Sequence, residues 1–186
     1  MRKRTIIGCL LISSAFSAAA QTNKNKAAAV YISAGDIQAP LKSVSPDKPF
    51  TEQAIRTVAV GKMHVGVAAV HRPAGVTQTS VAHDELTEIY HILTGSGTLV
   101  TGGALVKPES YIRVGTQFEA ADRQTIRDNA GPSTRGAGIE NGVSRKVRAG
   151  DVVIIPAGAP HWFSSIDGAI EYEVMRIDPG GLLSLK

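Results

Sequence analysis

Two stretches of the chain concentrate the side chains that could do chemistry. Residues 75–95 contain His83 and Glu88, and residues 150–165 contain His161. Imidazole and carboxylate groups can transfer protons and can bind divalent metals. Both stretches also contain glycines, which permit the sharp turns that bring distant side chains together. The chemistry of the chain is therefore expected to depend on how the fold joins the two stretches.

The two stretches resemble the two sequence motifs of the cupin superfamily, G-x5-H-x-H-x3–4-E-x6-G and G-x5-P-x-G-x2-H-x3-N. The resemblance covers roughly residues 54–178. It implies an all-β fold, a single cupin-type double-stranded β-helix (a jelly-roll barrel). The residues that carry it are Gly75, His83, Glu88 and Gly95 in the first motif, and Gly150, Pro156, Gly158 and His161 in the second.

The sequence departs from the family at two positions. Val81 stands where the family has its first histidine, and Ser165 stands where it has asparagine. The resemblance implies a metal held by up to four side chains, of which three carry over here: His83, Glu88 and His161. Two imidazoles and one carboxylate suit divalent iron, manganese, nickel or zinc and leave positions open for substrate or water.

The missing histidine leaves two interpretations open. In the first, the protein is a metal-dependent enzyme acting on a small organic molecule, and the resemblance implies oxygenase, isomerase or lyase chemistry. In the second, the barrel has lost its metal and holds a small molecule without catalysis. His83 and His161 would then be hydrogen-bonded interior residues, and Glu88 would need another partner or would stay protonated.

Successive side chains of a strand point to opposite faces, and this alternation predicts which residues lie beside the candidate metal ligands. Tyr90 shares a face with Glu88 and is the candidate catalytic residue, since a phenol can transfer a proton or orient a substrate. A core aromatic is the alternative for Tyr90. Phe163 is expected to line the interior. Arg176 is expected to be solvated or salt-bridged, with contact to a substrate carboxylate as the alternative.

The other histidines are expected to lie outside the site. His64 and His91 have the opposite periodicity, which predicts an exposed His64 and a surface or interface position for His91. His71 ends an alternating strand and could replace the missing ligand, although this is the less favoured interpretation. Trp162 is expected to pack against a sheet or at an interface.

Many short strands separated by Gly and Pro turns must position these groups. A helix capped by Ser33 and running to about Lys42 precedes them. Asn141–Gly142 predicts a two-residue hairpin between Ile139 and Val143. Gly95 and Gly97 are interpreted as turn glycines. The predicted strands are 57–60, 63–71, 88–100, 152–155 and 169–177.

Composition and length favour one soluble-type domain with a real core. The chain has 186 residues, of which 43% are apolar and 19% charged. No apolar run reaches the roughly 18–20 residues of a membrane-spanning helix. The basic residues show no interleaved aromatics, so the sequence makes no case for nucleic acid as a partner.

The first 20 residues predict a signal peptide. A positive start at 2–4 precedes a short apolar run at 5–16 and small residues at 18–20. The protein is therefore expected to be exported, to the periplasm or outside the cell. Removing 1–20, which contains three basic and no acidic residues, lowers the formal net charge from +4 to +1. Cys9, the only cysteine, would leave with this segment.

The domain boundaries follow from these assignments. After the signal peptide (1–20), an N-terminal arm (21–53) precedes the barrel (54–178), and a tail (179–186) follows it. Residues 107–149 are interpreted as an insertion, either a solvated surface loop or a lid over the site. The resemblance to small exported cupins also implies a homodimer.

Overall fold

The computed structural model describes residues 28–44, 50–76, 78–110 and 130–186. These ranges contain one short helix and a set of strands, as the all-β prediction requires. In chain order the elements are α1 (Ala34–Lys42), β1 (Thr51–Val60), β2 (Met63–Pro73), β3 (Ser80–His83), β4 (Thr87–Thr101), β5 (Ala104–Leu105), β6 (Glu109–Ser110), β7 (Ser133–Gly136), β8 (Ile139–Glu140), β9 (Val143–Arg148), β10 (Val152–Ile155) and β11 (His161–Asp178).

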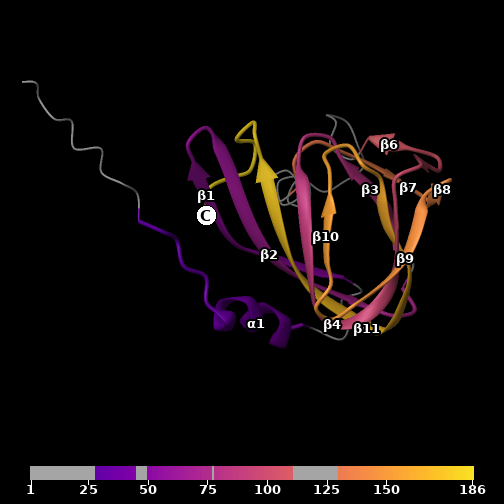
Figure 1. Ribbon diagram of the computed structural model, residues 1–186, viewed down its shortest axis with the longest axis horizontal. Helices are drawn as coiled ribbons and strands as arrows, with labels where there is room; N and C mark the ends of the chain where they lie inside the picture. The colour runs from indigo at the N-terminus through magenta and orange to yellow at the C-terminus, as the bar shows by residue number, and fades with distance from the viewer. Residues whose placement is uncertain (1–27, 45–49, 77, 111–129) are drawn as a thin grey trace, which may run out of the picture.

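The helix begins where the sequence predicts. Ser33 is its N-cap, with the Ser33 hydroxyl accepting from the backbone N–H of Asp36 at 3.1 Å. The Asp36 carboxylate accepts in return from the backbone N–H of Ser33 at 2.8 Å. This reciprocal capping box satisfies N–H groups that the first turn leaves without partners. Helix α1 lies outside the barrel, near β2 (Figure 1).

The main sheet curls into a barrel because two long strands share it. Its order is β1-β2-β11-β3-β7-β6, and β4 pairs with β11, β9 and β10. Strands β4 and β11 run antiparallel along most of their lengths, from Thr87 opposite Ile177 to Thr101 opposite His161. Figure 1 shows the strands wrapping around a common interior. The structure thus confirms a mostly β, cupin-type fold.

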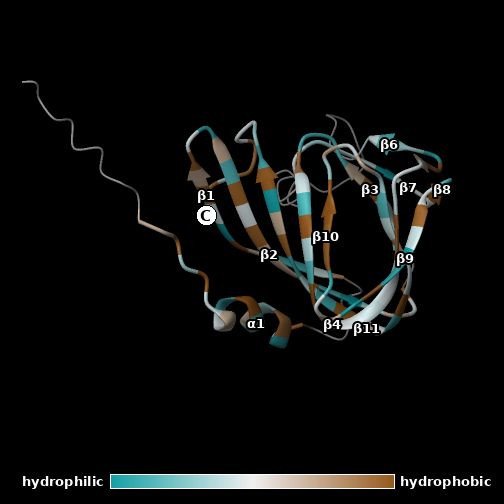
Figure 2. Cartoon of the chain, in the orientation of Figure 1, coloured by the Kyte–Doolittle hydropathy of each residue, from teal (hydrophilic) through white to brown (hydrophobic). Residues whose placement is uncertain are grey.

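The core consists of apolar side chains at alternate strand positions. This spacing arises because successive side chains of a strand point to opposite faces. Figure 2 shows hydrophobic and hydrophilic residues interspersed along the strands. The buried cluster comprises Ala68, Val70, Tyr90, Ile92, Leu99, Val147, Ile155, Phe163, Ile170, Tyr172 and Val174.

Gly95 and Gly97 are not turn residues, which corrects the sequence interpretation. Strand β4 runs through both without a break. Gly95 has a φ of 76°, and a Cβ atom added there would lie 1.9 Å from the carbonyl oxygen of Ala169 on β11. The glycine therefore permits a close backbone approach at a register shift between β4 and β11.

The hairpin predicted at Asn141–Gly142 is also wrong. Asn141 has the positive φ of a turn residue, 57°. However, β8 before it pairs with β5, whereas β9 after it pairs with β4. The turn carries the chain from one sheet to the other, because hydrogen-bond partners elsewhere in the fold outweigh the local pairing signal.

The C-terminal part of the predicted insertion belongs to the sheet. Strand β7 pairs with β3, and β9 pairs with β4. The centre of the insertion, 111–129, lies outside the described residues, and so does the predicted signal segment 1–20. The lid and the signal peptide stay predictions. In the described part of the chain, no helix is long and apolar enough to cross a membrane.

The tail returns to the barrel after β11. Lys186 exchanges two backbone hydrogen bonds with Thr57, at 3.2 and 3.1 Å. The backbone N–H of Leu183 donates to the buried Asp178 carboxylate at 2.7 Å, and the Nδ1 atom of His64 lies 2.7 Å from the Leu183 carbonyl oxygen. His64 is therefore partly buried under the tail, and its predicted exposure is wrong.

Candidate metal centre

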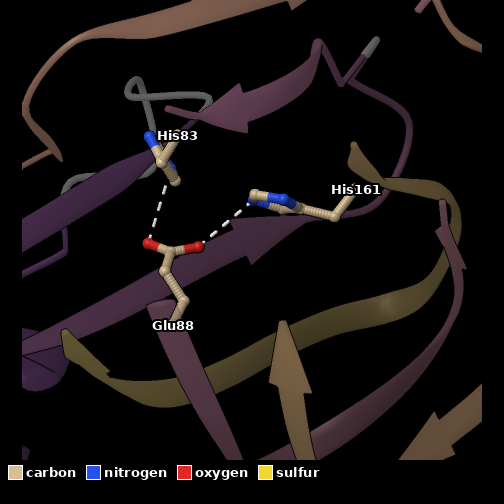
Figure 3. A group of neighbouring side chains, drawn as sticks. All are labelled: His83, Glu88 and His161. Atoms are coloured by element: carbon tan, nitrogen blue, oxygen red, sulfur yellow. Dashed lines mark ion pairs between the residues drawn. The ribbon is translucent and has the colours of Figure 1, made fainter. Parts of the chain in front are cut away.

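The fold brings together the three residues that the sequence analysis named as metal ligands. His83 ends β3, Glu88 lies near the start of β4, and His161 begins β11. Their candidate ligand atoms all lie within 4.8 Å of one another, and all three side chains are buried. Figure 3 shows the two imidazole rings pointing toward the two oxygens of the Glu88 carboxylate.

Hydrogen bonds fix which nitrogen of each imidazole carries the proton. The Ser133 hydroxyl donates to the carbonyl oxygen of Gly131 at 3.0 Å, so it accepts from His83 Nδ1 at 2.8 Å. His161 Nδ1 donates to the carbonyl oxygen of Ala159 at 3.1 Å. Both rings therefore carry their proton on Nδ1 and present the Nε2 lone pair to the site, as metal-binding histidines do.

These lone pairs face negatively charged oxygen atoms. His83 Nε2 lies 3.4 Å from Glu88 Oε1, and His161 Nε2 lies 3.2 Å from Glu88 Oε2. His161 Nε2 is buried without a hydrogen-bond partner. Lone pairs that converge in this way repel one another unless a cation lies among them. The three residues therefore fit a metal ion.

The charge states of the site residues also suit a metal cation. Burial lowers the pKa of His83 to about 4, although the charge of Glu88 opposes this shift. His83 is thus neutral at neutral pH, the form that binds metals. Burial acts to raise the pKa of Glu88, but the positive charge of Arg176 holds that pKa well below its usual value. Glu88 is therefore ionised.

Two further side chains donate to Glu88. The Tyr90 hydroxyl donates to Oε2 at 2.9 Å, and Arg176 Nε donates to Oε1 at 2.8 Å. Arg176 Nη1 also donates to Glu52 Oε1 at 2.5 Å. The prediction of a salt-bridged Arg176 is confirmed. Arg176 therefore bridges two carboxylates beside the two imidazoles.

Tyr90 lies in the site, on the face that the sequence predicted. Burial and the negative charge of Glu88 raise the pKa of Tyr90 well above its usual value. The phenol therefore keeps its proton and holds it at Glu88 Oε2. It can donate a proton or a hydrogen bond but is a poor base. Its catalytic role stays a prediction.

The structure shows no fourth histidine, cysteine or carboxylate at the position of the ligand lost at Val81 among the residues that it describes. No fourth His, Cys, Asp or Glu joins the three in this part of the chain. His71, the alternative that the sequence left open, contacts Glu171 at 3.1 Å and is not part of the cluster. The core face of β2 carries Ala68 and Val70, which have the opposite parity to His71.

The other predicted neighbours lie where the alternation places them. His91 is half-exposed and contacts Glu173 at 2.9 Å, away from the site. Phe163 is buried in the core. Trp162 donates its indole N–H to the carbonyl oxygen of Gln78 at 2.9 Å, which is a packing role within the sheet.

Sequence reasoning missed two residues that act on the site. Glu52 was assigned to the N-terminal arm, but it lies in β1, opposite Val70 of β2. Ser133 was assigned to the insertion, but it lies in β7, opposite His83. Neither has a spacing signal, because only strand pairing brings these residues to the site.

Comparison with known families identifies a match over most of the chain. The family model described as Cupin matches residues 53–182. No curated protein matches the chain.

Several solved structures are similar to this chain at low sequence identity. An oxalate oxidase is 20% identical, with 73% of this chain and 54% of that chain covered and a TM-score of 0.43. The DMSP lyase DddQ from Ruegeria pomeroyi DSS-3 is 18% identical, with 72% and 50% covered and a TM-score of 0.42. The cupin domain of Schizosaccharomyces pombe Cnp3 is 13% identical, with 74% and 71% covered and a TM-score of 0.43. The chain spans about half the length of the first two. These likenesses are too distant to assign an activity.

Proposed function

The chain belongs to the cupin family, and we propose that it binds a divalent metal ion through His83, Glu88 and His161 and acts on a small organic molecule beside it. One observation carries this proposal. Two buried Nε2 lone pairs point at an ionised carboxylate, and His161 Nε2 has no hydrogen-bond partner. A cation bound among these atoms would remove the repulsion between the imidazole lone pairs and the carboxylate.

Each residue of the site has a defined part in the proposed function. Iron, manganese, nickel or zinc, when bound, would supply Lewis-acid polarisation or dioxygen binding. Ser133 and the Ala159 carbonyl hold the imidazole rings in the orientation that binding needs. Tyr90 holds a proton at the edge of the cluster, where it can be donated to a substrate. Oxygenase, isomerase and lyase chemistry all remain compatible with this set.

A second candidate function is supported by Arg176. Its guanidinium already bonds to Glu88, so the carboxylate has a charge partner without any metal. Together with Val81 at the missing ligand position, this favours a barrel that holds a small molecule without catalysis. The two functions differ in whether the purified protein contains metal.

Elemental analysis of the protein, purified without chelator or a nickel column, separates these functions. We expect near-stoichiometric iron, manganese, nickel or zinc in the wild type. His83→Ala and His161→Ala should each lose roughly tenfold or more of this metal while the fold stays intact. His91→Ala is the matched control, because His91 is half-exposed and lies outside the cluster.

Two results would contradict the metal site. One is unchanged metal content in both site variants. The other is a folded, metal-free wild type whose thermal stability no added divalent ion increases. Either result would leave the non-catalytic barrel as the function of the protein.

Export and a homodimer are also proposals, supported by the sequence alone. Cleavage after residue 20 would give Gln21 as the first residue of the mature chain. N-terminal sequencing of protein from fractionated cells checks export, and light scattering during size-exclusion chromatography checks the dimer.

A further inference from the structure

We propose that Arg72 binds a carboxylate or similar anionic group of the small molecule that the barrel holds, so that this molecule is an organic acid. The inference rests on the proposed function for the presence of a ligand in the barrel. It adds the chemical class of that ligand, which neither the motifs nor the metal centre defines.

Arg72 faces the interior of the barrel. It lies on β2 with the same parity as Ala68 and Val70, two residues of the core, and pairs with Ile170 of β11. Its guanidinium carbon lies 5.9 Å from the ring centroid of Phe163, which is also in the core. An arginine in this position is costly unless something in the interior uses its charge.

Among the residues that the structure describes, the hydrogen-bond partners of Arg72 are neutral. Arg72 Nε donates to the Tyr172 hydroxyl at 2.8 Å, and Nη1 donates to Gln78 Oε1 at 2.6 Å. Burial raises the pKa of Tyr172, so its hydroxyl is neutral. Within the described ranges no carboxylate forms an ion pair with Arg72. Glu52 attracts Arg72 through space, but the hydrogen bond of that carboxylate goes to Arg176.

The neutral partners also hold the guanidinium in place. Gln78 Nε2 donates to the carbonyl oxygen of Val76 at 3.2 Å, which turns Gln78 Oε1 toward Arg72. The Phe50 ring centroid lies 4.4 Å from the guanidinium carbon. A guanidinium has five N–H donors, and two of them are used here. The remaining N–H groups are held in place but donate to no described residue, and Arg72 is only partly buried. This leaves the fork that binds carboxylates in two hydrogen bonds.

The position of Arg72 connects it to the candidate metal centre. The Tyr172 ring packs on the Tyr90 ring with centroids 4.5 Å apart, and Tyr90 donates to Glu88. Phe163 follows His161 by two residues on the same face of β11, a spacing of roughly 7 Å. Arg72 and the candidate metal centre are thus linked through the stacked rings of Tyr172 and Tyr90.

Ligand binding by the metal-free protein tests this assignment. The probes are acetate, butyrate and hexanoate, each paired with its neutral amide, measured by calorimetry or ligand-observed NMR with chelator present. We expect the wild type to prefer at least one carboxylate over its amide by roughly tenfold or more. Arg72→Met should reduce that carboxylate to the affinity of the amide. Arg145→Met, which removes an exposed positive charge from β9, should change nothing.

Two outcomes would overturn the proposal: no carboxylate preference in the wild type, or an unchanged preference in Arg72→Met. If Arg72→Met does not fold, Arg72→Gln keeps hydrogen-bonding capacity without the charge and gives the same comparison. Because the measurement is made without metal, a missing metal site would not remove the carboxylate preference. Failure of the proposed function and failure of this inference are thus distinguishable.

Discussion

The two arginines on the inner face of the barrel differ in how their charges are balanced. Arg176 donates to Glu88 and Glu52, so two carboxylates surround it. Arg72 donates to a tyrosine hydroxyl and a glutamine amide oxygen, and neither group is charged. Both side chains lie on strands next to one another, since β2 pairs with β11.

This difference separates a structural charge from one that is open to a ligand. A buried guanidinium between carboxylates completes an ion-pair network, and removing it leaves charges behind. Removing a guanidinium whose partners are neutral leaves no unpaired charge behind. We therefore expect stability to depend on Arg176 and ligand binding to depend on Arg72.

The largest expected effect is on the stability of Arg176→Met. The variant leaves Glu88 and Glu52 without their shared cation, and an uncompensated buried charge costs about 3–5 kcal/mol. The free energy of unfolding, from urea denaturation followed by circular dichroism, should fall by this amount. A loss below about 1 kcal/mol would show that the two carboxylates find other partners, and the comparison would fail.

Arg72→Met should have a smaller effect on stability. It removes two hydrogen bonds to neutral groups and keeps an apolar side chain of similar length between Phe50 and Phe163, which predicts a loss of about 1–2 kcal/mol. The same urea measurement checks this value, with Arg145→Met as the control at about 0.5 kcal/mol or less. If Arg72→Met were as destabilising as Arg176→Met, Arg72 would be a structural charge too.

The smallest effect is expected for Glu52→Gln. This change leaves Arg176 with one carboxylate and one neutral acceptor, so its surroundings become more like those of Arg72. Because Glu52 is partly exposed, the loss should be about 1 kcal/mol. Thermal unfolding checks this, and Glu109→Gln on the exposed Arg135 pair provides the matched control with a loss near zero. A larger loss for Glu109→Gln than for Glu52→Gln would break the ranking.

The sequence predicted the metal cluster because its residues lie inside motifs with fixed spacing. His83 and Glu88 are on strands that follow one another in the chain and are joined by a short turn. Glycines stand on either side of the segment that leads to His161. Alternation also placed Tyr90 on the face of Glu88, whereas Arg176, expected to be solvated or salt-bridged, is buried in its ion pairs. Glu52 and Arg72 carry no motif. Their roles depend on the pairing of β1 with β2 and of β2 with β11, and pairing between distant strands is not encoded in local spacing.

The same distinction explains the fold predictions that were wrong. Gly95 carries a local signal for a turn, but an approach of β11 decides its role. Asn141 does turn the chain, yet the strands on either side have partners in different sheets. The helix after Ser33 was predicted well because capping is a local interaction that requires no distant residue.

The return of the tail to β1 has a consequence for association between molecules. Strand β1 is the outermost strand of its side of the sheet, and such an edge offers unpaired N–H and C=O groups to strands of other molecules. Lys186 occupies these groups at Thr57 with two backbone hydrogen bonds. The backbone groups of Thr57 are therefore not available to a strand of another molecule at this point of the edge.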